Sequence, residues 1–79
     1  MSGPAFQPYT VPFFSQGFGF RELATLPSEH AFTQLIDYIK SLGGIPNGMW
    51  YEFDRDEYMH DTVQRARDLG GIVYNLPVA

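Results

Sequence analysis

The residues best suited to chemistry lie between positions 52 and 61, where carboxylates and a histidine are concentrated. Four carboxylates fall within the six residues from Glu52 to Glu57. Paired carboxylates can act as general acid and base when burial separates their pKa values. These residues are expected at a junction between a strand and a helix, and such junctions are usually exposed. The sequence therefore favours capping, solubility or docking on a basic partner over catalysis.

A metal site is the second chemistry to consider. Glu57 and His60 are three residues apart, the spacing of half a carboxylate-bridged metal site in helical bundles. Such a site needs a second helix with an equivalent pair, and His30, the other histidine, has only Glu29 beside it. No nucleophile–histidine arrangement and no lysine-containing phosphate loop is evident. We expect no catalytic residues, no metal and no cofactor.

Length and charge narrow the class of protein. Seventy-nine residues predict one small domain, 1–79, which buries only roughly 60% of the surface of its unfolded chain. The net charge of −4 argues against binding nucleic acid and is compatible with docking on a basic protein surface. The chain has no cysteine, no apolar run of membrane-spanning length and no secretory signal pattern. We therefore expect a cytoplasmic protein.

The first twenty residues carry no charged side chain but many aromatic ones. Tyr9 to Phe14 is predicted to be an edge strand, because Pro12 cannot donate a hydrogen bond to a neighbouring strand. Residues 1–16 are interpreted as a Pro- and Phe-rich arm that packs either on the domain's own sheet or on a partner chain, which leaves a homodimer open. The candidate arm or oligomer contacts are Phe6, Tyr9, Phe13 and Phe14.

Two helices are predicted from apolar residues at helical spacing, over Pro27–Leu42 and Asp54–Leu69. Asp54 is expected to cap the second helix, with Glu57 completing a capping-box-like pattern. Each helix ends in Leu-Gly-Gly-Ile, and the two copies of this motif are 27 residues apart. Either duplication of a helix–strand unit or the ordinary need for glycine at helix ends explains this repeat.

Strands are predicted over Phe18–Thr25, Met49–Phe53 and Ile72–Leu76, with Ile45–Gly48 as a loop. The predicted order is β-β-α-β-α-β. It gives an α/β (α+β) two-layer sandwich with a four-stranded mixed sheet and both helices on one face. Alternation places Trp50 on the face opposite Phe53, where it serves as an interface anchor or lies beneath the arm.

Gly17-Phe18-Gly19-Phe20 resembles the core of the RNP1 signature of RNA-recognition motifs. The resemblance covers about thirty residues, because here, as in that family, the signature lies at a strand that leads into a helix. Gln16 and Arg21 replace the usual basic and aliphatic neighbours of the signature. The resemblance implies that Phe18 and Phe20 stack on bases.

The function we expect is a non-enzymatic, acidic protein-binding domain. It would act as a stoichiometric inhibitor or adaptor on a basic partner surface, one that normally holds nucleic acid being an example. Phage-encoded anti-CRISPR proteins have this general size and charge. The alternatives are a homo-oligomeric domain that uses the Phe-rich arm and a sheet that binds RNA or single-stranded DNA. The predicted partner-binding residues are Trp50, Glu52, Asp54, Asp56, Glu57 and Asp61.

Overall fold

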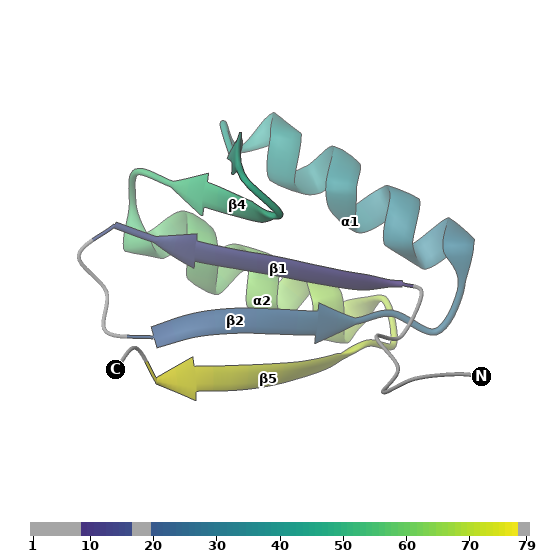
Figure 1. The fold of residues 1–79 in the computed structure, drawn as a ribbon. Helices are drawn as coiled ribbons and strands as arrows, with labels where there is room; N and C mark the ends of the chain where they lie inside the picture. The colour runs from purple at the N-terminus through teal and green to yellow at the C-terminus, as the bar shows by residue number, and fades with distance from the viewer. Residues whose placement is uncertain (1–8, 17–19, 78–79) are drawn as a thin grey trace.

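A computed structural model describes residues 9–16 and 20–77 of the chain. These residues form an α+β fold in which two helices lie on one face of a mixed five-stranded sheet (Figure 1). The strand order across the sheet is β3-β4-β1-β2-β5, with β1 and β4 parallel and the other neighbours antiparallel. The elements are β1 (Thr10–Ser15), β2 (Phe20–Thr25), α1 (Glu29–Ser41), β3 (Ile45–Asn47), β4 (Trp50–Phe53), α2 (Asp56–Asp68) and β5 (Ile72–Pro77).

The predicted class and both helices are therefore confirmed, but the prediction of four strands is wrong. The chain runs β-β-α-β-β-α-β, because the segment expected to be a loop contains the short strand β3. Asn47 pairs with Trp50, which leaves Gly48 and Met49 as a two-residue hairpin turn. Gly48 has a φ of 65°, and a positive φ at this first central position is typical of such hairpins.

The prediction that β1 lies at an edge is also wrong, because β1 is the central strand. The main chain of alternate β1 residues faces β4, as the hydrogen bond from Gln16 N to Phe53 O shows. By this alternation the nitrogen of Pro12 faces Met49, just before β4 begins. The missing N–H of Pro12 therefore removes no bond from the ladder. Residues 10–15 are an integral strand rather than part of an arm.

The two helices begin differently from one another. Ser28 caps α1, and its hydroxyl accepts a hydrogen bond from Ala31 N at 3.1 Å. The N-cap of α2 is Arg55, which makes no side-chain capping bond. The predicted capping role of Asp54 is therefore wrong, because the helix begins one residue too late for its carboxylate to occupy the cap. Asp56 and Glu57 still lie in the first turn, where the helix dipole favours negative charge.

The core lies between the sheet and the two helices. Val11 and Phe13 of β1 point into it, while Pro12 and Phe14 point to the opposite face of the sheet, which neither α1 nor α2 covers (Figure 1). We call that second face the open face. The hydrophobic core consists of Val11, Phe13, Ala24, Leu26, Ala31, Leu35, Ile39, Phe53, Met59 and Ala66.

Both helices end in the same hydrogen-bonded motif. After α1, Gly43 N bonds to Lys40 O at 3.1 Å and Gly44 N bonds to Ile39 O at 2.9 Å. After α2, the equivalent bonds from the two glycines to Arg67 O and Ala66 O measure 2.9 and 2.8 Å. This pair of bonds is the Schellman motif. Helix termination alone therefore explains the repeated Gly-Gly, and duplication is not required.

Candidate functional site

Four of the predicted carboxylates, Glu52, Asp54, Asp56 and Glu57, lie at the junction of β4 and α2, and Asp61 lies further along α2. We call Glu52, Asp54, Asp56, Glu57 and Asp61 the acidic margin. All except the half-buried Glu52 are exposed to solvent. Their position follows from local structure, because β4 ends at Phe53 and α2 begins three residues later. The margin therefore presents several negative charges at one end of the sheet.

Neutral donors hold two of these carboxylates in place. The amides of Gln16 and Asn47 both donate to Glu52, the latter at 2.9 Å. The hydroxyl of Ser15 donates to Asp56. Neutral donors fix the position of a carboxylate without cancelling its charge. The margin is thus ordered by β1 and β3, and it keeps its negative potential.

An ion pair within the described residues joins Arg55 and Glu57, with 3.5 Å between Nη1 and Oε1. Both side chains are more than 60% exposed, and an exposed pair of this kind contributes about 0–1 kcal/mol. The acidic margin is therefore not neutralised residue by residue, and it can interact with an external cation or basic side chain.

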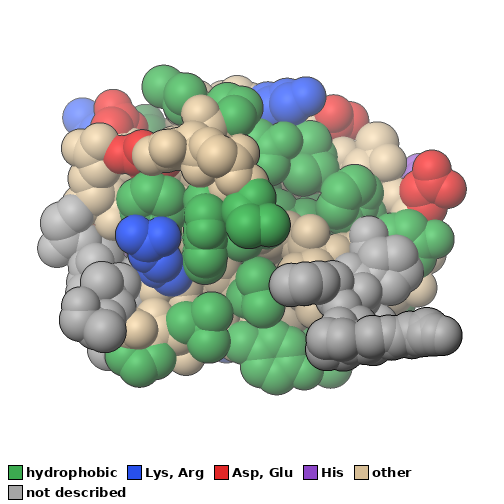
Figure 2. All heavy atoms as spheres, in the orientation of Figure 1, with side chains coloured by type: hydrophobic (Ala, Val, Ile, Leu, Met, Phe, Trp, Pro, Cys, Tyr) green, Lys and Arg blue, Asp and Glu red, His purple; other side chains and the backbone are tan. Residues whose placement is uncertain are grey.

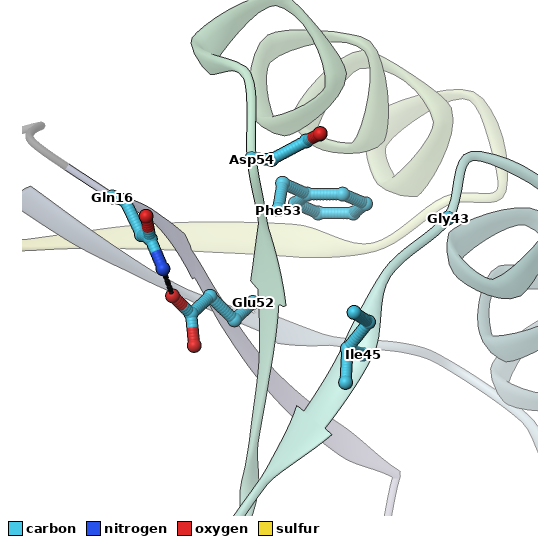
Figure 3. Close-up of a pocket in the computed structure, with 6 residues that line it drawn as sticks. All are labelled: Gln16, Gly43, Ile45, Glu52, Phe53 and Asp54. Carbon is cyan, nitrogen blue, oxygen red and sulfur yellow. Dashed lines mark hydrogen bonds between the residues drawn. The ribbon is translucent and has the colours of Figure 1, made fainter.

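A shallow pocket of about 180 Å³ opens beside the acidic margin. Figure 3 shows the ring of Phe53 pointing toward Ile45 and Gly43, with Glu52 turned to the other side, toward Gln16. Glu52 and Asp54 do not point toward one another in this view (Figure 3). Acid–base catalysis by a carboxylate pair needs both groups to reach one reacting atom. Glu52 and Asp54 therefore do not form such a pair.

The open face carries a compact cluster of two aromatic rings and one guanidinium group. Arg21 Cζ lies 4.6 Å from the ring centroid of Phe14 and 5.0 Å from that of Trp50. The two rings meet edge to face, with centroids 6.1 Å apart. We call Phe14, Arg21 and Trp50 the aromatic cluster. Trp50 is half-buried and belongs to this cluster rather than to the hydrophobic core.

Apolar side chains continue across the rest of the open face, which Figure 2 shows as largely hydrophobic with a basic side chain among them. On β5, Ile72 is 60% exposed, Tyr74 51% and Leu76 41%. A second hollow, of about 430 Å³, lies at the end of the sheet where β1 and β5 begin and β2 ends. Its lining, which includes Tyr9, Pro27 and Tyr74, has no charged residue. Contiguous apolar surface on a small domain typically marks an interaction site.

The aromatic residues expected to make arm or oligomer contacts are separated by the structure. Phe13 is fully buried against Phe53 within the domain's own core, so it is not available for contact with another chain. Tyr9 packs against Phe32 at 6.1 Å between centroids. Phe14 lies on the open face, and Phe6 is outside the described residues, as are the side chains of Phe18 and Phe20.

Among the residues the structure describes, no group of three His, Cys, Asp or Glu side chains is arranged to hold a metal ion. His30 and His60 are both exposed, at the start of α1 and within α2. No helix in the described ranges has the length and apolar character needed to cross a membrane.

Sequence reasoning missed Glu22, the carboxylate that the fold buries. Glu22 is 4% exposed on the helix-covered face of β2, where Asn75 Nδ2 donates to its Oε2 at 2.6 Å. Burial raises the pKa of Glu22, and the bond from Asn75 and the charges of His60 and Arg67 oppose that shift. Alternation with Ala24 could have predicted this burial.

Replacing Glu22 with glutamine is expected to change how stability depends on pH. The pKa of Glu22 is raised in the folded state from its ordinary value of 4.5. Ionisation of Glu22 therefore lowers the folding stability as the pH rises from 4.5 through the raised pKa. The glutamine variant lacks this loss, so its advantage over wild type should grow toward neutral pH and vanish below pH 4.5. Urea unfolding at several pH values measures this difference. The exposed Glu57→Gln variant controls for charge removal, and an equal pH effect there would contradict the prediction.

Comparison with known proteins gave no match: no protein-family model, no curated protein and no solved structure is significantly similar to this chain. The order of the elements along the chain is a known one, with one strand added to the sheet. From β2 to β5 the elements follow the β-α-β-β-α-β order of ferredoxin-like folds, and β1 is an additional strand between β4 and β2. A fold of this kind does not by itself define a function.

Proposed function

We propose that this chain is a non-enzymatic protein-binding domain that acts as a stoichiometric inhibitor or adaptor on a basic partner. The observation that carries the proposal is that a carboxylate of the acidic margin lies beside the aromatic cluster. Glu52 of the acidic margin is aligned with Phe14 of the aromatic cluster in the β1–β4 pair. The open face therefore has an apolar centre with a carboxylate, Glu52, at its border, and protein interfaces likewise have an apolar core and a polar rim.

The chemistry of this surface defines the partner. Tryptophan, tyrosine and arginine are the residues that most often dominate binding energy at interfaces, and the open face carries all three in Trp50, Tyr74 and Arg21. The carboxylates at its border would guide the approach of a positively charged surface and select against acidic ones. The partner is therefore a protein with apolar groups beside lysine or arginine side chains.

Reversal of charge at the acidic margin tests this proposal. The triple variant Asp54→Lys, Asp56→Lys and Glu57→Lys should lose at least about tenfold in partner affinity, because the introduced lysines would repel the basic surface of the partner. Affinity capture from cell lysate, at low and high salt, compares this variant with wild type. Capture by wild type should weaken at high salt.

A matched variant separates this effect from net charge. Glu29→Lys, Asp37→Lys and Asp68→Lys make the same charge change at exposed helical positions away from the margin. This control should capture the same partners as wild type, provided that circular dichroism shows both variants folded. Equal capture by the margin variant and wild type would contradict the proposal.

The aromatic cluster also supports a second candidate function, the binding of single-stranded nucleic acid. Aromatic rings beside an arginine can stack on bases, and each stacked base contributes about 1–3 kcal/mol. Titration with single-stranded RNA and DNA at low salt, followed by Trp50 fluorescence, distinguishes the candidates. Quenching that disappears in Phe14→Ala would favour nucleic acid, whereas unchanged fluorescence favours a protein partner.

A further inference from the structure

Within the described residues, no strand pairs with the outer edge of β5. The opposite edge of the sheet is β3, which has three residues and contains Pro46. Short length, proline and charge are the usual means by which proteins prevent pairing at an edge. β5 has six residues, none of them charged, and its proline comes last. The two edges therefore differ in their capacity to accept another strand.

The hydrogen-bond pattern of β2 shows which main-chain groups face β5. Leu26 N donates to Tyr9 O at 2.9 Å, so Tyr9 and Leu26 are a hydrogen-bonded pair at the end of the antiparallel β1–β2 ladder. Bonded pairs alternate along an antiparallel ladder, so Ala24 and Glu22 also direct their main-chain groups to β1. Leu23, between them, directs its N–H and C=O to β5.

The same alternation identifies the free groups of β5. Leu23 pairs with Tyr74, so the main-chain groups of Tyr74 point inward to β2. Those of Val73 and Asn75 then point outward, and each residue offers one donor and one acceptor. Pro77 has no N–H, so it adds no donor to this edge. The outer edge is a short, defined row of two donors flanked by turn and proline.

We propose that two copies of this chain pair their β5 strands antiparallel about a two-fold axis at Tyr74. In this register, Val73 of each copy exchanges both hydrogen bonds with Asn75 of the other, and all of these free groups are satisfied. Side chains on the open face also face equivalent or similar side chains. Tyr74 lies opposite Tyr74 of the other copy, and Ile72 lies opposite Leu76 of the other copy. The two sheets become one continuous sheet with a doubled open face.

Neighbouring registers leave main-chain groups of β5 without a hydrogen-bond partner. An axis at Asn75 places the Val73 carbonyl opposite Pro77, which has no N–H to donate. An axis at Val73 places the Asn75 carbonyl opposite Gly71, whose N–H already bonds to Ala66 O at 2.8 Å. Each alternative leaves an acceptor unpaired, and unpaired main-chain groups in a buried interface are costly. The Tyr74-centred register is therefore preferred.

A second copy is the occupant best supported by the charges and the size of the chain. Each copy carries a net charge of −4, but β5 itself has no charged residue. Two copies that pair through β5 therefore bring no like charges of that strand together. A 79-residue domain buries a limited fraction of its surface alone and gains burial by pairing. The self-complementary pairing of the exposed Ile72, Tyr74 and Leu76 is a property that a foreign strand would have to reproduce.

Sedimentation equilibrium of the wild-type chain provides the first test, and a concentration-dependent dimer is expected. Tyr74→Lys and Tyr74→Glu should each be monomeric, because like charges would face each other across the axis. An equimolar mixture of these two variants should recover the dimer. Met49→Lys, at a 72% exposed position in the β3–β4 turn, should remain dimeric. A wild-type monomer at all concentrations would overturn the proposal.

Cysteine cross-linking tests the register, because the chain has no cysteine of its own. Tyr74→Cys should form a disulfide-linked dimer on mild oxidation, whereas Ile72→Cys alone should not, since it faces Leu76 of the other copy. A mixture of Ile72→Cys and Leu76→Cys should cross-link. Cross-linking by Ile72→Cys alone would overturn the register. A monomeric wild type that pairs β5 with a foreign peptide would overturn the dimer and assign the edge to that partner.

Discussion

Replacing Phe13 with alanine is expected to remove a large part of the folding free energy of this domain. Phe13 is fully buried in the central strand, and its ring meets Phe53 edge to face at 6.3 Å between centroids. Truncating a buried phenylalanine costs about 3–5 kcal/mol, because apolar contact is lost and a cavity remains. A domain of this length is typically stable by about 4–12 kcal/mol. The variant should therefore unfold at a much lower urea concentration than wild type.

The adjacent Phe14 provides a matched control. Phe14→Ala removes the same side chain one residue later, but from the open face, where it contacts Trp50 and Arg21. Loss of these partly exposed aromatic and cation–π contacts should cost about 1 kcal/mol. Urea unfolding followed by far-ultraviolet circular dichroism measures both variants without depending on Trp50 fluorescence. Equal losses would contradict the assignment of the two sheet faces.

Several parts of the fold were predictable because they depend on neighbours in sequence. Apolar residues three and four apart defined both helices, and glycine pairs marked their ends. Alternation within β4 correctly directed Phe53 to the core and Trp50 to the other face. These features follow from the periodicity of a helix or strand, which a single segment already contains.

The position of β1 could not be predicted because it depends on pairing between distant segments. Proline argues for an edge strand only when its nitrogen faces a partner that needs a donor. Pro12 faces the residue before β4, and that fact depends on the β1–β4 register. The short strand β3 is similar, since its three residues become a strand only through pairing with β4.

In the candidate site, too, features set by sequence neighbours were predictable, whereas contacts between distant segments were not. Clustered carboxylates at the start of α2 were visible in the sequence, and their exposure follows from that position. Their partners were not visible, because Ser15 and Gln16 are about forty residues away along the chain. The aromatic cluster joins β1, β2 and β4 in the same way. Partner binding by these surfaces stays a prediction that the capture experiment addresses.

The two glycines after each helix should differ in the reason they are required, and this difference can be measured. Gly70 has a φ of 86°, in the left-handed region, while a side chain there would meet only Pro27 at 3.5 Å. Alanine at this position should cost about 1–2 kcal/mol through its backbone conformation. Asparagine tolerates that conformation, so Gly70→Asn should recover much of the loss.

Gly71 is required for space rather than for conformation. A Cβ atom there would lie 2.9 Å from Leu26 Cδ1, 2.9 Å from Thr25 O and 3.0 Å from Ala66 O. Two of these atoms belong to the main chain and cannot rotate away, so α2 and β2 would have to separate. Gly71→Ala should therefore cost about 2–3 kcal/mol, toward the upper part of the range for overpacked sites.

Asparagine substitution distinguishes the two causes, because Gly71→Asn should be at least as destabilising as Gly71→Ala. The pair after α1 provides an independent copy of this experiment. A Cβ atom on Gly43 meets nothing within 4 Å, whereas one on Gly44 would lie 2.5 Å from Ile39 Cγ2 and 3.1 Å from Phe53 Cε1. Urea unfolding of all four positions should show asparagine rescue at the first glycine of each pair only. Rescue at Gly71 would show that conformation, not packing, limits that position.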